Sequence, residues 1–301
     1  MTEYHTPVLL NESIEGLNID PEGIYVDLTF GSGGHSGEIL KKLKGGKLIS
    51  FDQDEEAKQN AIDDKRFVFV QGNFRFFKNF LLYLGFEKVN GVFADLGVSS
   101  HHFDKTERGF SFRSEGLLDM RMNKSAKLTA AHLVNNLAAD KLSNIFYEYG
   151  EIRNAHQVAG LIAKARNTKS IETTFDLCKA LAPLTPKGIE HKFLAKVFQA
   201  LRIEVNAEME ALREMLEQTP EMIISGGRLV ILTYHSLEDR LVKNFMRSGN
   251  FEGKTESDVF GNVNGLPFKT FNNKVIIPSE TEINLNSRAR SAKLRIAIKN
   301  D

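Results

Sequence analysis

Four glycines stand within seven positions directly after an apolar run, in VDLTFGSGGHSGE, residues 26–38. A glycine-rich turn between a strand and a helix exposes backbone N–H groups and lets a ligand approach unobstructed by Cβ atoms. Enzymes that bind a dinucleotide or S-adenosylmethionine use such a turn. The dinucleotide fingerprint, counted from Gly31, requires a last glycine or alanine where this chain has Ser36. The stretch therefore predicts a cofactor-binding turn that only nearly matches the dinucleotide pattern.

Three acidic residues lie near this turn, each at the end of a predicted strand. Asp52 comes 21 residues after Gly31, where it can accept hydrogen bonds from both hydroxyls of the ribose that either cofactor carries. Asp27 is typical of the acidic start of a methyltransferase glycine motif, where it orients the loop or binds the methionine ammonium. Asp95, in ADLGVSS, ends a later strand at the sheet edge where ligands bind. Asp27 and Asp95 favour S-adenosylmethionine.

Short apolar runs, separated by amphipathic stretches, must position these acids. The runs that predict strands are residues 23–30, 46–54, 66–72, 89–98 and 225–236. Between them, apolar residues recur at spacings of three and four, which predicts helices and hence a βαβα series on a parallel sheet. Residues 274–280 and 291–299 predict a terminal hairpin that completes a sheet of about seven strands. The predicted fold class is α/β with a Rossmann-like sheet.

One crossover is too long for this series. From Asp95 to Arg228 is 133 residues, whereas a strand–helix repeat here takes about twenty, so an inserted domain is expected. Apolar periodicity predicts helices in it at residues 129–137, 140–150, 154–167 and 173–182, with a longer helix over 191–216. We therefore expect a discontinuous domain of residues 1–105 and 201–301, with a helical insert of residues 106–200.

The composition limits the remaining classes. Lys and Arg number 39, as do Asp and Glu, and 42% of the residues are hydrophobic, as in a globular protein. No apolar run approaches the ~18 residues that span a bilayer, which predicts a cytoplasmic protein. Cys178, the only cysteine, is expected on a buried helix face. His101 and His102 have neither cysteines nor clustered carboxylates beside them, so no metal site is predicted.

The C-terminal segment NSRARSAKLRIAIK, residues 286–299, carries five cationic residues and no acid. Such a local excess predicts a phosphate-facing patch. A solvated terminal strand is the alternative.

Motifs along nearly the whole chain resemble those of one family. They are HTPVLLNE, DLTFGSGGHS, FDQD, ADLGVSS, ERGFSF, LDMRM, FQALRIEVN, GGRLVILTYHSLEDR and SRARSAKLR, in this order. Together they resemble the bacterial 16S rRNA cytosine N4-methyltransferases of the RsmH/MraW type. The resemblance implies a Rossmann-like class I methyltransferase domain with an inserted helical domain for RNA recognition. It also implies methyl transfer from S-adenosylmethionine to the exocyclic amine of a cytosine in the decoding region, with 16S rRNA of the small ribosomal subunit as partner.

The cofactor positions of this family can be carried over to the present chain. They fall on Gly33, Gly34, His35, Asp52, Phe74, Asp95 and His102. The first three match the glycine-histidine turn, Asp52 matches the ribose acid and Phe74 the aromatic on the adenine side. Many members have glutamine where this chain has His102, which is shorter in reach and titratable.

The chemistry that the resemblance implies needs a hydrogen-bond acceptor. Cytosine N4 is a poor nucleophile because its lone pair is delocalised into the ring, and an acceptor for its N–H helps it to react. We expect Asp95, or a backbone carbonyl in DLGVSS, to be this acceptor. His235 is the other expected catalytic residue, and with Glu238 it would shape the opposite wall of the site.

The ERGFSF motif suggests how the insert could contact RNA. Phe110 and Phe112 are expected to stack near the target strand, with Arg108 and Arg113 on its phosphates. Burial in a core is the alternative for the two phenylalanines.

Two rival functions remain at this point. A DNA amino-methyltransferase would share the chemistry, but such enzymes usually carry Pro-Pro and an aromatic residue after the fourth strand, where this chain has DLGVSS. An NAD-dependent oxidoreductase is disfavoured by Ser36 and by the predicted terminal hairpin.

Overall fold

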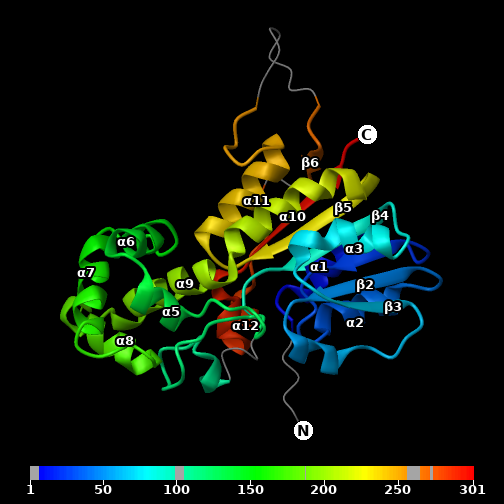
Figure 1. The fold of residues 1–301 in the computed structure, drawn as a ribbon. Helices are drawn as coiled ribbons and strands as arrows, with labels where there is room; N and C mark the ends of the chain where they lie inside the picture. The colour runs from blue at the N-terminus through cyan, green and yellow to red at the C-terminus, as the bar shows by residue number, and fades with distance from the viewer. Residues whose placement is uncertain (1–6, 99–104, 187, 256–264, 272–273) are drawn as a thin grey trace. The chain divides into compact units, whose positions relative to one another are not determined.

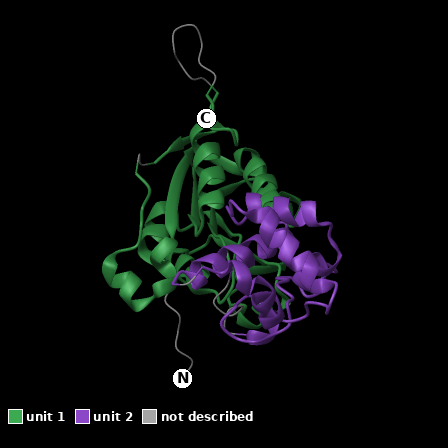
Figure 2. Cartoon of the chain, turned by 90° about the vertical axis from the view of Figure 1, so that its left-hand side faces the viewer, with its two compact units in different colours: residues 1–97, 209–301 green, residues 98–208 purple. Residues whose placement is uncertain are grey.

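The computed structural model describes residues 7–98, 105–186, 188–255, 265–271 and 274–301. The chain forms two compact units (Figure 2). Unit 1 comprises residues 1–97 and 209–301, and unit 2 comprises residues 98–208. The predicted insert, residues 106–200, falls within unit 2.

A seven-stranded sheet forms the centre of unit 1, in the order β3-β2-β1-β4-β5-β7-β6. Its strands are β1 (Ile24–Asp27), β2 (Lys47–Asp52), β3 (Phe67–Gln71), β4 (Val89–Asp95), β5 (Ile223–Thr233), β6 (Phe268–Thr270) and β7 (Lys293–Lys299). The first five strands run parallel to one another, whereas β7 runs antiparallel to both β5 and β6. The predicted α/β class with a Rossmann-like sheet is confirmed.

Helices cover both faces of this sheet (Figure 1). On one face lie α1 (Leu10–Leu17) and α2 (Gly34–Lys42); on the other lie α3 (Phe77–Tyr83), α10 (Glu208–Met222) and α11 (Ser236–Ser248). Successive strand residues point to opposite faces, and Leu48 and Ile49 are both fully buried. Burial on both faces explains why the strands read as continuous apolar runs. None of the helices described is both long and apolar enough to cross a bilayer.

The predicted terminal hairpin was wrong in its first strand. The partner of β7 is β6, and of residues 274–280 only Ile276 pairs with the sheet, by an isolated bridge to Leu294. Pro278 has no N–H to donate to a ladder. Directly after it, the Ser279 side chain accepts the Glu282 N–H at 3.1 Å and begins helix α12 (Glu280–Leu285).

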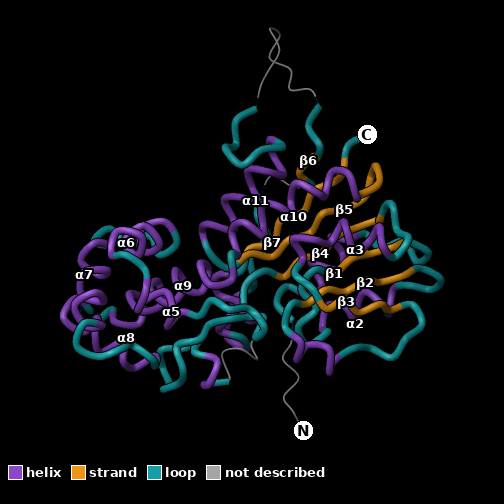
Figure 3. Tube along the Cα trace, viewed as in Figure 1, coloured by secondary structure: helices purple, strands orange, loops and turns teal. Residues whose placement is uncertain are grey.

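Unit 2 contains the helices predicted for the insert, joined by loops (Figure 3). They are α5 (Ala130–Asn136), α6 (Ala139–Glu148), α7 (Ala155–Arg166), α8 (Thr174–Leu181) and α9 (Glu190–Asn206). Their apolar stripes enclose one core, which includes Leu142, Phe146, Leu177 and Phe198. This core gives unit 2 a hydrophobic centre of its own.

The single long helix predicted over residues 191–216 was wrong. Ala207 adopts the left-handed conformation, with φ 48°, and separates α9 from α10. The Arg202 guanidinium holds the break by donating to Glu208 at 2.8 and 2.9 Å. Apolar spacing could not reveal the break, because the stripe continues through it.

Candidate functional site

Three carboxylates end neighbouring strands of unit 1. Asp27 ends β1, Asp52 ends β2 and Asp95 ends β4. These strands are parallel and β1 lies between the other two, so the three residues stand at one edge of the sheet. The chain order reverses there, since β1 connects onward to β2 but also pairs with β4. Ligands of open α/β sheets bind at such a switch point.

The glycine turn joins β1 to α2 at this edge. Gly31 and Gly33 have φ values of +53° and +81°, which residues with a Cβ rarely adopt. A Cβ on Gly33 would lie 3.0 Å from the Phe30 ring, whereas for one on Gly31 the nearest atom of the described residues, the Thr29 carbonyl oxygen, would be 4.0 Å away. Helix α2 follows Gly33, which has no side chain to cap it, so within the described ranges no side-chain cap occupies the N–H groups of its first turn. The turn thus has one packed side and one open side.

Gly34 has a different constraint from its neighbours. A Cβ there would lie 2.3 Å from Pro7 Cγ. The absence of a side chain at Gly34 therefore serves close packing of the N-terminal segment, and its predicted cofactor contact rests on its backbone.

Asp52 shapes the turn directly. Its Oδ2 accepts the Gly31 N–H at 2.8 Å, and its Oδ1 accepts the Asp54 N–H at 2.8 Å. An ionised carboxylate has about four lone-pair sites. That Asp52 also accepts the ribose hydroxyls, the role that the sequence predicts for it, stays a prediction.

Asp27 is buried beneath the turn. Its carboxylate accepts the Ser36 hydroxyl at 2.6 Å and the Thr29 N–H at 3.0 Å. Burial raises the pKa of Asp27 to about 6, although both hydrogen bonds act in the opposite direction. These contacts are those of a residue that orients the loop, one of the two roles considered for it.

Asp95 is held at two points and remains reachable. Its N–H donates to Thr29 Oγ1 at 2.6 Å, and its Oδ1 accepts the Tyr234 hydroxyl at 2.7 Å. A quarter of its side-chain surface is exposed. Burial of the rest raises the pKa of Asp95 to about 7; the negative charges of Asp27 and Glu238 add to this, and the Tyr234 hydrogen bond opposes it. A carboxyl group with such a pKa can accept a proton near neutral pH.

Sequence reasoning missed Tyr234. It follows β5 directly and precedes His235, so it comes to the same edge as Asp95 by the register in which Asp95 pairs with Leu232. Burial, followed by the Asp95 charge, raises the pKa of Tyr234 well above its usual value. Its hydroxyl is therefore a permanent donor to Asp95, and its position one residue past a strand end was the available signal.

The His35 ring is buried behind Asp95. Its Nε2 lies 3.2 Å from the Val8 carbonyl oxygen, and its Nδ1 lies 3.8 Å from Asp95 Oδ2. Burial lowers the pKa of His35 to about 4, so the ring is neutral at pH 7. The ring packs against Phe93 and supports the wall behind Asp95.

His235 caps helix α11. Its Nδ1 accepts the Glu238 N–H at 3.4 Å, and Glu238 Oε2 accepts the N–H groups of His235 and Tyr234 at 3.3 and 2.9 Å. Glu238 is 2% exposed, and its other oxygen, Oε1, lies 3.1 Å from His235 Nε2, so the carboxylate is turned toward the start of its own helix. The reciprocal capping fixes His235 and Tyr234 at the carboxyl end of β5, and a catalytic role of His235 stays a prediction.

Phe74 begins a short 3₁₀ helix after β3. The Gly72 N–H donates to the Asp52 carbonyl at 2.8 Å, and the Asn73 side chain donates to Gln53 Oε1 at 2.9 Å. These bonds join the segment that bears Phe74 to the end of β2. Phe74 therefore lies near Asp52, as an aromatic on the adenine side requires. His102, the remaining predicted cofactor residue, lies outside the described residues, as does His101.

Two residues of the ERGFSF motif do not face a ligand. Arg108 is 3% exposed and donates to the carbonyl oxygens of Arg121 and Met122 at 2.8 and 3.1 Å. Phe110 is buried in the core of unit 2, which was the alternative to its stacking on RNA. The prediction that this pair contacts RNA was wrong, because Arg108 binds backbone carbonyl groups of the same loop and Phe110 packs in the core.

The other two residues of that motif are more accessible. Arg113 is exposed, and Phe112 is half-buried and stacks on His191 with ring centroids 5.8 Å apart. Their contact with RNA stays a prediction.

Comparisons with known proteins find relatives over nearly the full length of this chain. The model of the MraW methylase family matches residues 2–300. The chain is 59% identical to the ribosomal RNA small subunit methyltransferase H of Bacteroides thetaiotaomicron, covering 98% of this chain and 97% of the relative. It is 60% identical to the protein of that name from Phocaeicola vulgatus, with the same shares covered.

Among solved structures, an rRNA methylase from Streptococcus thermophilus aligns over 100% of both chains, with 12% identity and a TM-score of 0.44, a likeness too distant to bear on function. By contrast, the family model and the relatives described above match this chain over nearly its full length. This chain belongs to the MraW methylase family.

Proposed function

We propose that this protein transfers a methyl group from S-adenosylmethionine to the exocyclic N4 of a cytosine in the decoding region of 16S rRNA. The observation that carries the proposal is the Asp95 carboxyl group. It stands at the switch point of the sheet, is fixed by Thr29 and Tyr234, stays partly exposed and has a pKa of about 7. An acceptor of this kind is what a weakly nucleophilic amine requires.

The residues of the sheet edge fit the cofactor. The open side of Gly31 leaves room for a ligand against bare backbone, and the uncapped start of α2 presents N–H groups to a carboxylate. Asp52 would hold the ribose hydroxyls, and Phe74 would lie beside the adenine. No further charge is needed for a pyrophosphate, which this cofactor lacks.

When bound, S-adenosylmethionine supplies an electrophilic methyl group, which the N4 lone pair takes over while the sulfur keeps the bonding electrons. The Asp95 carboxylate accepts a hydrogen bond from an N4 N–H, which directs the lone pair away from the ring. As the new N–C bond forms, Asp95 takes up that proton, so the amine leaves uncharged. Much of the remaining catalysis is alignment by the rigid strand ends.

The Tyr234 and Thr29 bonds decide where Asp95 points. Tyr234 donates to Oδ1, which leaves Oδ2 as the oxygen for the substrate. The neutral His35 ring behind it adds no positive charge that would weaken the carboxylate as a base.

The substrate class follows from the relatives, which are named for the RNA of the small ribosomal subunit. RNA loops can turn a base out of its stack for a few kcal/mol or less, which makes a cytosine there accessible to the sheet edge. We assign RNA recognition to unit 2, with Arg113 and Phe112 as contacts, and we place the reaction in the cytoplasm.

The test uses the full chain with methyl-labelled S-adenosylmethionine. Unmethylated small ribosomal subunits, naked 16S rRNA and duplex DNA are offered separately, and the labelled nucleoside is identified after digestion. N4-methylcytidine from either RNA sample supports the proposal. Label in DNA would favour the DNA amino-methyltransferase instead, and binding of NAD without binding of S-adenosylmethionine would favour the oxidoreductase.

A further inference from the structure

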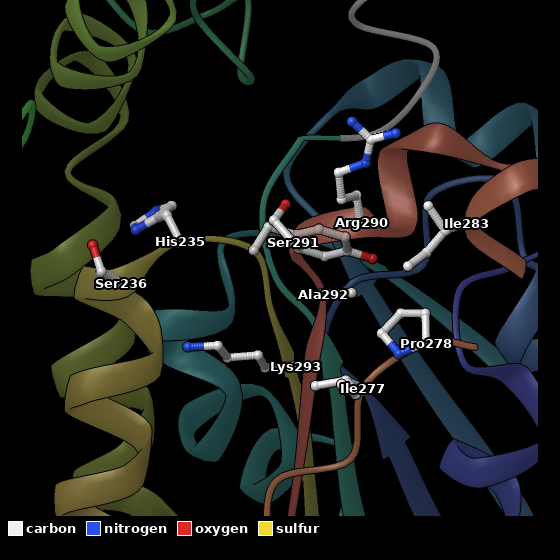
Figure 4. A pocket seen from close by; sticks show the side chains of 10 residues that line it. His235, Ser236, Ile277, Pro278, Ile283, Arg290, Ser291, Ala292 and Lys293 are labelled. Carbon is white, nitrogen blue, oxygen red and sulfur yellow. The ribbon is translucent and has the colours of Figure 1, made fainter. Parts of the chain in front are cut away.

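A pocket of about 300 Å³ opens beside the proposed active site, within unit 1 (Figure 4). It lies between the start of α11, the start of β7 and residues 277–283. Its volume is at the small end of the roughly 300–1,000 Å³ that ligand sites span, which suits a single nucleotide. None of the cofactor positions carried over from the family lines it.

The sheet register places this pocket at the active edge. Because β7 is antiparallel to β5, its first residue, Lys293, pairs with Thr233 at the carboxyl end of β5. Tyr234, the next residue, lines the pocket, and its hydroxyl bonds to Asp95. One side chain thus separates the pocket from the proposed hydrogen-bond acceptor.

The pocket and the cofactor cradle lie on opposite sides of β4. Asp52 ends β2 and the glycine turn follows β1, whereas the pocket lies at the ends of β5 and β7. In the sheet, β4 stands between these two pairs of strands. Asp95, at the end of β4, therefore lies between the two. The pocket thus lies on the side of Asp95 away from the cofactor cradle.

The charges around the pocket are suited to a phosphate. The Arg290 side chain is exposed and lines the pocket, and no hydrogen bond or ion pair joins it to another residue in the described ranges. Lys293 donates to Asp239 at 3.0 Å, and Arg295 donates to the same carboxylate at 2.7 Å. Two cations thus offset one carboxylate, and a lysine ammonium with three donors has others left for a ligand.

Two acidic residues lie near these cations, and each binds a backbone N–H group. Glu238 is bound to the N–H groups of Tyr234 and His235. Glu282 Oε1 accepts the Leu9 N–H at 2.7 Å. Both carboxylates are engaged by backbone donors.

The remaining wall of the pocket is apolar. Ile277, Pro278 and Ile283 lie together on the side away from α11, while Lys293 points toward α11 (Figure 4). Ile277 is 63% exposed, so it offers apolar surface to a ligand in the pocket. A cationic edge with an apolar wall matches a ribonucleotide, whose phosphate is anionic and whose sugar and base have apolar faces.

We propose that this pocket binds a nucleotide of the RNA strand adjacent to the target cytidine, with its phosphate on Arg290 and its sugar against Ile277 and Ile283, while Lys293 adds positive charge on the α11 side. The inference rests on the proposed function and extends it, because it names residues 290–293, within the basic segment 286–299, as the part of the sheet domain that holds the substrate strand. By holding the neighbouring nucleotide, the pocket sets the distance from the strand to Asp95.

The test compares Arg290→Ala with Lys299→Ala. Each removes one cation from the same basic segment, but Lys299 lies at the far end of β7, where Ile298 pairs with Arg228, and does not line the pocket. Methylation of 16S rRNA is measured for wild type and both variants over a series of salt concentrations, with cofactor affinity by calorimetry and folding by thermal melting. Arg290 is exposed, so Arg290→Ala is expected to fold. The thermal melt checks the folding of Lys299→Ala.

Arg290→Ala should raise KM for RNA about fivefold. It should also make the negative slope of log(kcat/KM) against log[salt] shallower by about 0.7, the value for one lost single-strand phosphate contact. Lys299→Ala should leave the slope near that of wild type, and cofactor affinity should be unchanged in both. Equal slopes for the two variants overturn the pocket while leaving the methyltransferase proposal intact. If wild type methylates no RNA, the proposed function and the pocket both fail.

Discussion

The Tyr234 hydroxyl donates a 2.7 Å hydrogen bond to Asp95 Oδ1, across two neighbouring parallel strands. Tyr234 itself is fixed because its N–H donates to Glu238, the reciprocal partner of the capping residue His235 in the first turn of α11. The start of one helix therefore determines the orientation of a carboxyl group on another strand. The basicity of Asp95 therefore depends on Tyr234 and Glu238 as well as on its own burial.

Tyr234→Phe should move the pH dependence of methyl transfer upward. The hydroxyl lowers the pKa of Asp95, so its removal raises that pKa, and a higher pH is needed to ionise the carboxyl group. Single-turnover rates at saturating cofactor, measured from pH 5.5 to 9, give the midpoint for each protein. Tyr25→Phe is the matched control, since its hydroxyl accepts the Asp20 N–H away from Asp95. A midpoint that stays in place or falls would refute the coupling.

Asp52→Asn should weaken cofactor binding about ten- to a hundredfold, because a charged acceptor contributes about 1.5–3 kcal/mol to its hydrogen bonds. The substitution also presents an amide to the Gly31 N–H that the carboxylate now accepts. Calorimetry with S-adenosylmethionine measures the change. Asp64→Asn, which alters an acid paired with Arg66, should bind the cofactor as wild type does. Equal affinities for all three proteins would remove Asp52 from the site.

Gly33→Ala should lower the free energy of unfolding by about 1–2 kcal/mol, the cost of the left-handed conformation for a residue with a Cβ. The new methyl group would also press on Phe30. Gly37→Ala, inside α2 with no atom within 4 Å of the added Cβ, should instead stabilise the protein by about 0.5–1 kcal/mol. Urea unfolding distinguishes them, and shifts in the same direction would contradict the turn geometry.

Burial raises the pKa of Asp27 from 3.8 to about 6, so the native state binds its proton more tightly than the unfolded chain does. The stability due to protonated Asp27 is therefore complete below pH 3.8 and is lost as pH rises through about 6. Relative to Asp27→Asn, wild type should lose stability across this window, with a slope of at most about 1.4 kcal/mol per pH unit. Urea unfolding from pH 4 to 8 measures the difference. If the stability of wild type relative to Asp27→Asn rose with pH instead, the result would contradict the raised pKa of Asp27.

Much of the edge could be predicted from the sequence because strand ends are local features. Asp27, Asp52 and Asp95 each follow a continuous apolar run, and parallel strands bring such ends together regardless of tertiary detail. The insert was predictable for a similar reason, since 133 residues between Asp95 and Arg228 exceed any simple crossover.

Features that depend on contacts between distant residues could not be read from the sequence. Tyr234 meets Asp95 only through the pairing of β4 with β5. Arg108 and Phe110 look like RNA contacts by composition, but their burial depends on how the loop closes over the core of unit 2. The apolar run at residues 274–280 likewise failed as a strand because Pro278 and the Ser279 cap override β propensity there.

The central claim, that Asp95 accepts the hydrogen bond of the reacting amine, is tested most directly by single-turnover methylation with Asp95→Asn at saturating S-adenosylmethionine. The account predicts a rate at least about a hundredfold lower than wild type, as for loss of a general base, with 16S rRNA binding unchanged and no recovery at high pH. A near-normal rate at saturating cofactor would contradict it and leave Asp95 with no role in the chemical step.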